Sequence, residues 1–139
     1  DSPAGPGPDW RKMTAFYQSI VGERFREGEH EAYLSAGGGG IEVVREVDNQ
    51  HDRNALAVIA VIDAASDAPR LKLGYLPRAF AAEVAATRPA DMPMKAVAVS
   101  TYTAQSGFRD MKIDVYEPSV RSGFWRDRGL TPPGKIRST

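Results

Sequence analysis

The chain contains no cysteine, and this absence excludes disulfide bonds and thiolate metal sites. A bound metal would need histidine and carboxylate ligands, and the chain has only two histidines, His30 and His51. Net charge is also absent, because 18 lysine and arginine residues balance 18 acidic residues. No overall electrostatic field then attracts nucleic acid or a membrane surface. Any site for an anion must therefore be local.

Long hydrophobic runs are missing as well. No apolar run approaches the roughly 18 residues that a membrane-spanning helix needs. The N-terminus also lacks the basic and then apolar pattern of a signal peptide. We therefore expect an intracellular protein with no membrane partner. The 139 residues, of which 42% are hydrophobic, suit one domain around one core.

The composition divides the chain into three parts. Residues 1–14 begin with "DSPAGPGPDW", which is rich in proline and glycine and is expected to be a disordered leader. Residues 15–117 carry the apolar patterns and are expected to form the domain. Residues 118–139 contain five basic residues against one acid, together with three prolines and three glycines, and are expected to be an extended basic tail.

Most of the central part has the pattern of β-strands. Six segments are aromatic, β-branched or alternating and are predicted to be strands: 15–25, 41–47, 55–62, 71–76, 95–103 and 109–117. The predicted strand 55–62, which follows the polar stretch 48–54, is apolar enough to be buried on both faces. The runs 26–40 and 63–69 are predicted to be loops.

One helix is predicted over "PRAFAAEVAAT", residues 77–87. Pro77 suits the first turn of a helix, because its missing N–H would have no partner there. Phe80, Ala81 and Val84 fall on one face, which is expected to dock on the sheet. A mostly β chain with so few helices predicts a small, mostly antiparallel barrel.

The stretch "DNQHD", residues 48–52, is the densest polar cluster in a strand connection. It resembles a calcium loop only superficially, because Arg53 and Ile59 occupy the positions that need glycine and glutamate. A transition-metal site would need more ligands than His51 and Asp52. Asp48, Asn49 and Asn54 are natural turn residues whose side chains bond to nearby backbone N–H groups, so most of the cluster could simply shape a turn.

Motifs for catalysis are lacking. The stretch "GLTPPGKI", residues 129–136, approaches a phosphate-binding loop, but Ile136 replaces the hydroxyl that binds magnesium, and Pro132 and Pro133 remove backbone donors. There is no G-x-S-x-G stretch and no paired nucleophile and base. We expect no catalytic residues, no metal and no cofactor.

Aromatic residues next to cations recur at predicted strand ends. The pairs are Arg24 with Phe25, Tyr75 near Arg78, and Phe108 with Arg109. Such pairs suit single-stranded nucleic acid, because a ring stacks on a base while the cation neutralises a phosphate. Phe25 and Tyr75 could equally belong to the core.

Three stretches together resemble the HIRAN domain family. "IVGERF", "VVREVDNQHDRNALAV" and "LGYLPRAFAAEV" are similar, in order and spacing, to a V-G-x-x-[FY] strand, an R-E-P-x-N-P-[YH]-D-x-N-A-[IL]-x-V block and a G-Y-[LV]-P-[RK] segment before a helix. The similarity runs from about Ile20 to Phe108. It implies a modified OB-like barrel that, in fork-remodelling translocases, holds the free 3′-hydroxyl end of single-stranded DNA.

The resemblance also implies roles for particular residues. Arg24 and Phe25 would contact the terminal nucleotides, with Phe25 stacking on a base. His51 would take the place of a base-stacking aromatic residue. Asp52 would accept a hydrogen bond from the terminal 3′-hydroxyl, which a carboxylate favours over a phosphate.

The remaining implied contacts come from later in the chain. Tyr75 and Arg78 would face backbone phosphates, and Phe108 would stack on a base from the other side. Val47 and Gln50 stand where the family pattern has prolines, which loosens the turn. The insert "VIDAASDAP" and the four glycines at 37–40 lengthen loops without touching a named contact.

The resulting hypothesis is a non-catalytic module that binds single-stranded DNA at its 3′ end, with a helicase or nuclease as a candidate partner and a location in the bacterial cytoplasm or nucleoid. Two alternatives stay open. One is a protein-interaction domain on the same fold, whose basic tail binds an acidic partner. The other is a metal-dependent nuclease that uses Asp52 and His51.

Overall fold

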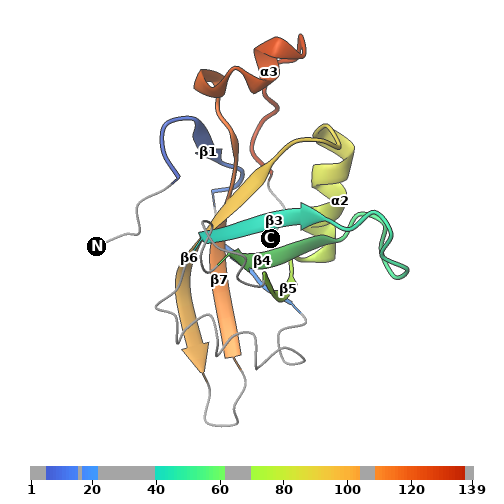
Figure 1. Ribbon diagram of the computed structural model, residues 1–139, viewed down its shortest axis with the longest axis vertical. Coiled ribbons are helices and arrows are strands. Elements are labelled where there is room, and N and C mark those ends of the chain that lie inside the picture. Colours follow the sequence, from blue (N-terminus) through green and yellow to red (C-terminus); the bar gives the residue numbers. More distant parts are fainter. Residues whose placement is uncertain (1–5, 16, 22–39, 62–69, 104–108, 137–139) are drawn as a thin grey trace.

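The computed structural model describes residues 6–15, 17–21, 40–61, 70–103 and 109–136. Within these described ranges, seven strands form a single sheet: β1 Trp10–Lys12, β2 Gln18–Ser19, β3 Gly40–Arg45, β4 Leu56–Val61, β5 Leu71–Tyr75, β6 Met94–Thr103 and β7 Arg109–Pro118. Their order is β1-β7-β6-β3-β4-β5, with β2 also paired to β7. All of these pairs are antiparallel, so the mostly β fold class predicted from the sequence is confirmed (Figure 1).

The strand ladders themselves do not close into a barrel. One bridged pair, Val21 with Tyr75, connects the segment after β2 to β5 at the far end of the sheet. Its two backbone hydrogen bonds measure 2.8 and 2.9 Å. Because β2 is paired to β7, this single bridge links the two ends of the strand order, and the result is a small OB-like sheet that is curled but open.

The predicted strands agree closely with the observed ones from β3 onward. β4 is buried at four of its six positions, as its apolar sequence predicts. Of the predicted strand 15–25, only the two residues of β2 and the bridge at Val21 are observed, and residues 22–25 lie outside the described residues. The predicted loops at 26–39 and 63–69 also lie outside them.

Helix α2, Arg78–Thr87, follows β5 and packs on the sheet through Phe80, Ala81 and Val84, the face predicted from their spacing. Pro77 is the N-cap residue rather than part of the first turn. Among the described residues no helix is long and apolar enough to cross a membrane. The core lies between this helix and β3, β4, β5, β6 and β7, and it includes Leu56, Val58, Leu73, Met111, Ile113 and Val115.

Residues 118–136 fold back onto the sheet, and this differs from the extended tail that the sequence predicts. They form a 3-10 helix, η2 Val120–Ser122, and a short helix, α3 Phe124–Asp127. Trp125 is only 3% exposed, and its indole N–H donates to the carbonyl of Pro118 at 2.8 Å. Ile136 is buried as well. Burial of these two apolar side chains contributes to the free energy that orders a segment rich in glycine and proline.

The N-terminal segment is likewise ordered from β1 onward, where a loose leader was expected. Met13 is fully buried and pairs through its carbonyl with the backbone N–H of Ile136 at 2.8 Å. Thr14 bridges Ile136 in parallel. The two ends of the described chain therefore stabilise each other, which neither end could predict alone.

A buried charge cluster joins these end segments to the sheet and α2. Glu117 on β7 is fully buried and accepts two hydrogen bonds from Arg88, at 2.8 and 2.9 Å. Arg11 on β1 donates to the same carboxylate at 3.0 Å. Arg88 also donates to the carbonyl of Gly134 at 3.0 Å. With both oxygens of Glu117 bonded to arginines, the cluster satisfies a carboxylate that would be very costly to bury alone.

Candidate nucleic-acid interface

The connection between β3 and β4, residues 46–55, is a tight turn built by its own side chains. Its base is closed by the backbone N–H of Glu46, which donates to the carbonyl of Ala55 at 2.9 Å. Inside the turn, Oδ1 of Asn49 accepts the backbone N–H groups of His51 at 2.9 Å and of Asp52 at 3.0 Å. Asn49 therefore shapes the turn, as predicted, and sets the direction in which the next residues point.

Asp52 uses its two carboxylate oxygens differently. Oδ1 accepts the backbone N–H of Asn54 at 2.9 Å, so one oxygen belongs to the turn. Oδ2 lies 3.8 Å from Nε of Arg78, the first residue of α2. The Asp52 side chain is 20% exposed, whereas that of Arg78 is 80% exposed. One oxygen of Asp52 is thus held in the turn while the other faces an exposed, solvated cation.

A second network fixes the base of the turn against β5. Glu46 accepts hydrogen bonds from the hydroxyl of Tyr75 at 2.9 Å and from the amide of Asn49 at 3.1 Å. Lys72 forms an ion pair with Glu46 at 2.5 Å and donates to the Tyr75 hydroxyl at 3.1 Å. The Lys72 ammonium also lies 5.2 Å from the centre of the Tyr75 ring. These contacts tie Asn49, and through it His51 and Asp52, to the sheet.

The network changes the proton affinities of its charged members. Burial raises the pKa of Glu46, but hydrogen bonds from Lys72, Asn49 and Tyr75 outweigh burial and hold that pKa below its usual value. The hydrogen bond to Glu46 raises the pKa of Lys72. Both groups therefore stay charged over a wider pH range than they would in a flexible chain.

Gly74 allows the segment after β2 to approach β5. Its φ is +153°, and a Cβ added there would lie 2.4 Å from Cγ2 of Ile20 and 2.7 Å from the carbonyl oxygen of Val21. Only glycine fits such a contact without displacing backbone. The glycine in "LGYLP" therefore permits the Val21–Tyr75 bridge, which forms one wall of the site.

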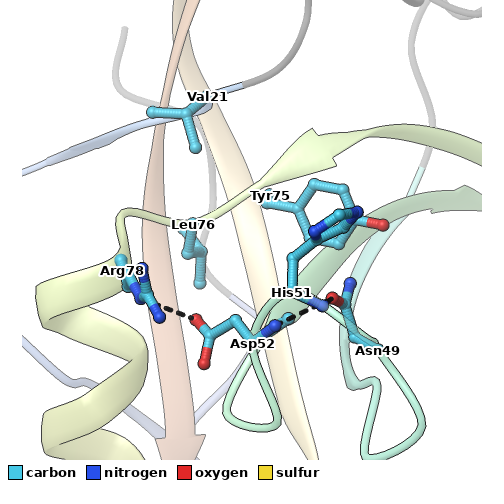
Figure 2. Close-up of a pocket in the computed structure, with 8 residues that line it drawn as sticks. Val21, Asn49, His51, Asp52, Tyr75, Leu76 and Arg78 are labelled. Carbon is cyan, nitrogen blue, oxygen red and sulfur yellow. Dashed lines mark hydrogen bonds and ion pairs between the residues drawn. The ribbon is translucent and has the colours of Figure 1, made fainter.

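These elements enclose an open pocket of about 420 Å³. This volume falls in the range of roughly 300–1,000 Å³ that is common for small-ligand sites. The residues that line it come from the segment after β2, the 46–55 turn, the end of β5 and the start of α2: Val21, Asn49, His51, Asp52, Ala55, Tyr75, Leu76 and Arg78. Figure 2 shows Asp52 between Arg78 on one side and His51 and Tyr75 on the other. The pocket therefore combines apolar side chains, such as Val21 and Leu76, with the polar side chains of Asn49, Asp52 and Arg78.

Four of the seven residues predicted from the sequence meet at this pocket: His51, Asp52, Tyr75 and Arg78. Arg24, Phe25 and Phe108 lie outside the described residues. Tyr75 and Arg78 line the same pocket, the Lys72 ammonium lies over the Tyr75 ring, and the Tyr75 hydroxyl points to Glu46. Tyr75 is half-buried, so it belongs partly to the sheet and partly to the pocket.

Sequence reasoning gave no role to Glu46 or Lys72. Glu46 lies inside the stretch "VVREVDNQHDRNALAV", so the motif marked its position without assigning it a contact. Lys72 carries no such signal, because a single lysine on a half-exposed strand is ordinarily a solvated residue. Their pairing depends on the 46–55 turn lying against β5.

A metal site that uses Asp52 and His51 is the alternative prediction for this turn. Among the residues that the structure describes, no group of three or more histidine, cysteine or acidic side chains could hold a metal ion. The polar groups at the pocket are instead arranged as hydrogen-bond acceptors and a cation.

Residues 13–116 match the family model of the HIRAN domain. The fold is similar to that of a crystal structure of a protein from Lactobacillus plantarum, with a TM-score of 0.50 at 20% identity, covering 78% of this chain and 96% of that chain. At this identity the likeness concerns the fold alone. No curated protein matches the chain.

Proposed function

Because the chain belongs to the HIRAN domain family, which is associated with DNA binding, we propose that it is a non-catalytic module for the free 3′-hydroxyl end of single-stranded DNA. Binding would not depend on base sequence. The pocket at the 46–55 turn would receive the terminal nucleotide.

The observation that carries this proposal is the arrangement of Asp52. Asp52 lines the pocket, its Oδ1 accepts the backbone N–H of Asn54, and its Oδ2 lies 3.8 Å from Nε of Arg78. A free 3′-hydroxyl can donate a short, charge-assisted hydrogen bond to Oδ2. A 3′-phosphate would instead place negative charge against the carboxylate, at a cost of about 1 to 4 kcal/mol at 4 Å, depending on the local dielectric. Asp52 therefore distinguishes a strand end from a strand interior.

Arg78 supports the same role through its exposure. An ion pair of 3.8 Å with an 80% exposed arginine is weak, on the order of 0–1 kcal/mol. The guanidinium can therefore leave Asp52 at little cost and neutralise the next phosphate along the strand. This exchange would free Oδ2 for the hydroxyl at the moment that DNA binds.

The flat groups at the pocket suit a base. His51 is exposed and Tyr75 is half-buried at the same pocket, beside the apolar side chains of Val21 and Leu76. Stacking of a base on an aromatic side chain contributes about 1–3 kcal/mol and tolerates any base. The family motif extends the proposal to Arg24 and Phe25, which would contact the terminal nucleotides, and to Phe108, which would stack from the other side.

Fluorescence anisotropy tests the proposal directly. Two labelled oligonucleotides of one sequence, ending in a 3′-hydroxyl or a 3′-phosphate, are titrated with the protein. We expect at least about tenfold tighter binding to the hydroxyl end, as one charge-assisted hydrogen bond implies. Equal affinity for the two ends would refute end recognition.

An end-binding module of this kind would direct another enzyme to DNA ends. We propose a helicase or nuclease as that partner and an intracellular location, because both follow from a role on cellular DNA. An oligonucleotide that keeps its length on incubation with the protein and magnesium would support a non-catalytic role. Shortening would contradict it.

A further inference from the structure

We propose that residues 118–136, here called the C-terminal lobe, form a second contact for nucleic acid, which binds the sugar–phosphate backbone without regard to sequence. This inference rests on the proposed function, because the lobe would hold the same strand whose 3′ end occupies the pocket. The lobe lies outside the 13–116 match to the HIRAN domain, apart from the connection through β7.

The charge of the chain is divided unevenly. The C-terminal lobe, residues 118–136, holds four of the 18 basic residues and one of the 18 acidic residues, a local net charge of +3. The remaining 120 residues therefore carry a net charge of −3. If the rest of a DNA-binding domain carries a net negative charge, its cations must lie where they can contact the phosphates of the bound strand. The C-terminal lobe is the part of the chain that supplies them.

The cations of the lobe are also available. Arg121, Arg126 and Lys135 are exposed and form no ion pair with any residue that the structure describes. Three cations on or beside the sheet, by contrast, are paired with carboxylates: Lys12 with Asp114, Arg70 with Glu42 and Lys72 with Glu46. An unpaired exposed arginine gains more from a phosphate than one that must first leave a carboxylate.

The lobe is a folded platform and not a loose tail. Trp125 anchors it from within, and the backbone N–H of Ser119 donates to the carbonyl of Asp9 at 2.7 Å. Gly123 joins η2 to α3 with φ of +81°, a conformation that glycine adopts without strain. The backbone at Arg121 and Arg126, on either side of this junction, is therefore fixed by the fold, so binding a strand would have to order only their side chains.

Aromatic rings with cations accompany these charges. The Arg128 guanidinium lies 3.9 Å from the centre of the Phe124 ring, which packs edge-on against Trp125. Below the lobe, Lys95 lies 4.8 Å from the centre of the Trp10 ring. Guanidinium planes and aromatic rings both stack on unpaired bases. An acidic protein segment would match the charge of the lobe but would make no use of these flat surfaces.

A shallow pocket of about 240 Å³ continues this surface. Trp10, Pro93, Met94 and Lys95 are among the residues that line it. Trp10 pairs with Pro118, where the lobe begins. The lobe and this pocket are therefore neighbours, joined through the pairing of β1 with β7.

The position of the lobe sets the length of strand that it can reach. Arg78 begins α2 at the end-binding pocket, and Asp91, just beyond the other end of α2, pairs with Arg128 of the lobe at 2.6 Å. Figure 1 shows α3 beyond that end of the helix. A ten-residue helix is about 15 Å long, so a strand must extend several nucleotides past the pocket to reach the lobe. Single OB-type sites cover about 4–16 nucleotides.

The test compares strand lengths in the full chain. Binding to oligonucleotides of about 5 and about 15 nucleotides, which bracket the range of OB-type sites, is measured over a series of salt concentrations. The lobe variant is Arg121→Ser/Arg126→Ser. The charge-matched control is Lys12→Ser/Arg70→Ser, which removes two paired cations from the sheet.

We expect the lobe variant to bind the short oligonucleotide as tightly as the unmodified protein does. The unmodified protein should bind the longer oligonucleotide more tightly than the short one, and the lobe variant should not. The slope of log affinity against log salt should fall by about 1 to 1.5 for the longer strand only, since each phosphate contact contributes about 0.7. Arg121→Lys/Arg126→Lys should restore most of the slope, because it keeps the charge.

Other outcomes would overturn the proposal. An unchanged slope in the lobe variant, or an equal loss in the control, would show that the lobe does not touch the strand, while a persisting preference for the 3′-hydroxyl would leave the proposed function intact. If the preference for the 3′-hydroxyl is lost while the lobe variant still lowers the salt slope, the proposed function fails and the contact of the lobe with nucleic acid stands. Equally tight binding of a poly-glutamate peptide would indicate an acidic protein partner in place of nucleic acid.

Discussion

The side-chain amide of Asn49 donates a hydrogen bond of 3.1 Å to Oε1 of Glu46, so the residue that shapes the 46–55 turn is itself held by the end of β3. The other atom of that amide, Oδ1, accepts two backbone N–H groups. One side chain thus connects the charged network on the sheet to the residues displayed at the pocket. The position of Asp52 therefore depends, through Asn49, on the hydrogen bond that Glu46 accepts.

Asn49→Ala should therefore weaken both the fold and the site. The substitution leaves two backbone donors without their acceptor, and we expect a loss of about 1–2 kcal/mol in the free energy of unfolding. The preference for a 3′-hydroxyl should shrink as well. Urea unfolding and anisotropy measure the two effects. Asp48→Ala is the control, because Asp48 is exposed in the same turn, and an equal loss there would contradict the role given to Asn49.

Asp52→Asn separates the charge of this residue from its place in the turn. Asparagine keeps an oxygen that can accept the N–H of Asn54, so the turn should survive. Removing the negative charge should bring the affinities for 3′-hydroxyl and 3′-phosphate ends to within about twofold, which from a tenfold preference is a loss of about 1 kcal/mol of discrimination. Arg78→Ala should instead weaken binding to both ends alike and flatten the salt dependence. An unchanged preference in Asp52→Asn would remove Asp52 from the mechanism.

Stability should depend on pH through Glu46 and Lys72. The pKa of Glu46 is lowered by folding, so its contribution is present above the ordinary value of 4.5 and is lost as pH falls through the lower folded pKa. The pKa of Lys72 is raised, so its contribution is present below the ordinary value of 10.5 and is lost as pH rises through the higher folded pKa. Glu46→Gln should flatten the acid side of the stability profile. If Glu46→Gln loses as much stability at low pH as the unmodified protein does, Glu46 is not the source of the pH dependence.

Gly74→Ala should destabilise the closure of the sheet. The added Cβ would meet Ile20 at 2.4 Å and the backbone of Val21 at 2.7 Å. We expect a loss of about 2–4 kcal/mol from overpacking and backbone strain. Gly134→Ala has nothing within 4 Å of its added Cβ and should stay within about 0.5 kcal/mol. Thermal unfolding of the two variants compares them directly, and similar midpoints would argue against the close approach.

Arg88→Met should be among the most damaging single changes. It leaves the fully buried Glu117 with Arg11 alone, and we expect a loss of about 3–5 kcal/mol. Lys12→Met breaks the exposed pair with Asp114 and should cost less than about 1 kcal/mol. If both cost the same in urea unfolding, the buried cluster would not be the anchor of the two end segments.

Local patterns predicted the elements well. The apolar runs of β4 and β5, the alternation of β6 and β7, and the face of α2 containing Phe80 and Val84 all follow from periodicities within single segments. The family motif named His51, Asp52, Tyr75 and Arg78, and the structure brings these four residues to one pocket, where their roles stay predictions. The elements could be predicted because each depends on neighbours in the chain.

The amino-acid sequence by itself determined the strands from β3 to β7, the helix α2 and the turn that displays a carboxylate beside a histidine, but not β1, η2 or α3. Tertiary structure alone decided that Glu46 meets Lys72, that Arg88 meets Glu117, and that Ile136 lies beside Met13. Each of these partners looks in isolation like an ordinary charged or apolar residue. Their roles arise only when folding brings distant segments within a few ångströms and removes water from between them. Burial determines how strongly a paired charge or a packed apolar side chain affects stability.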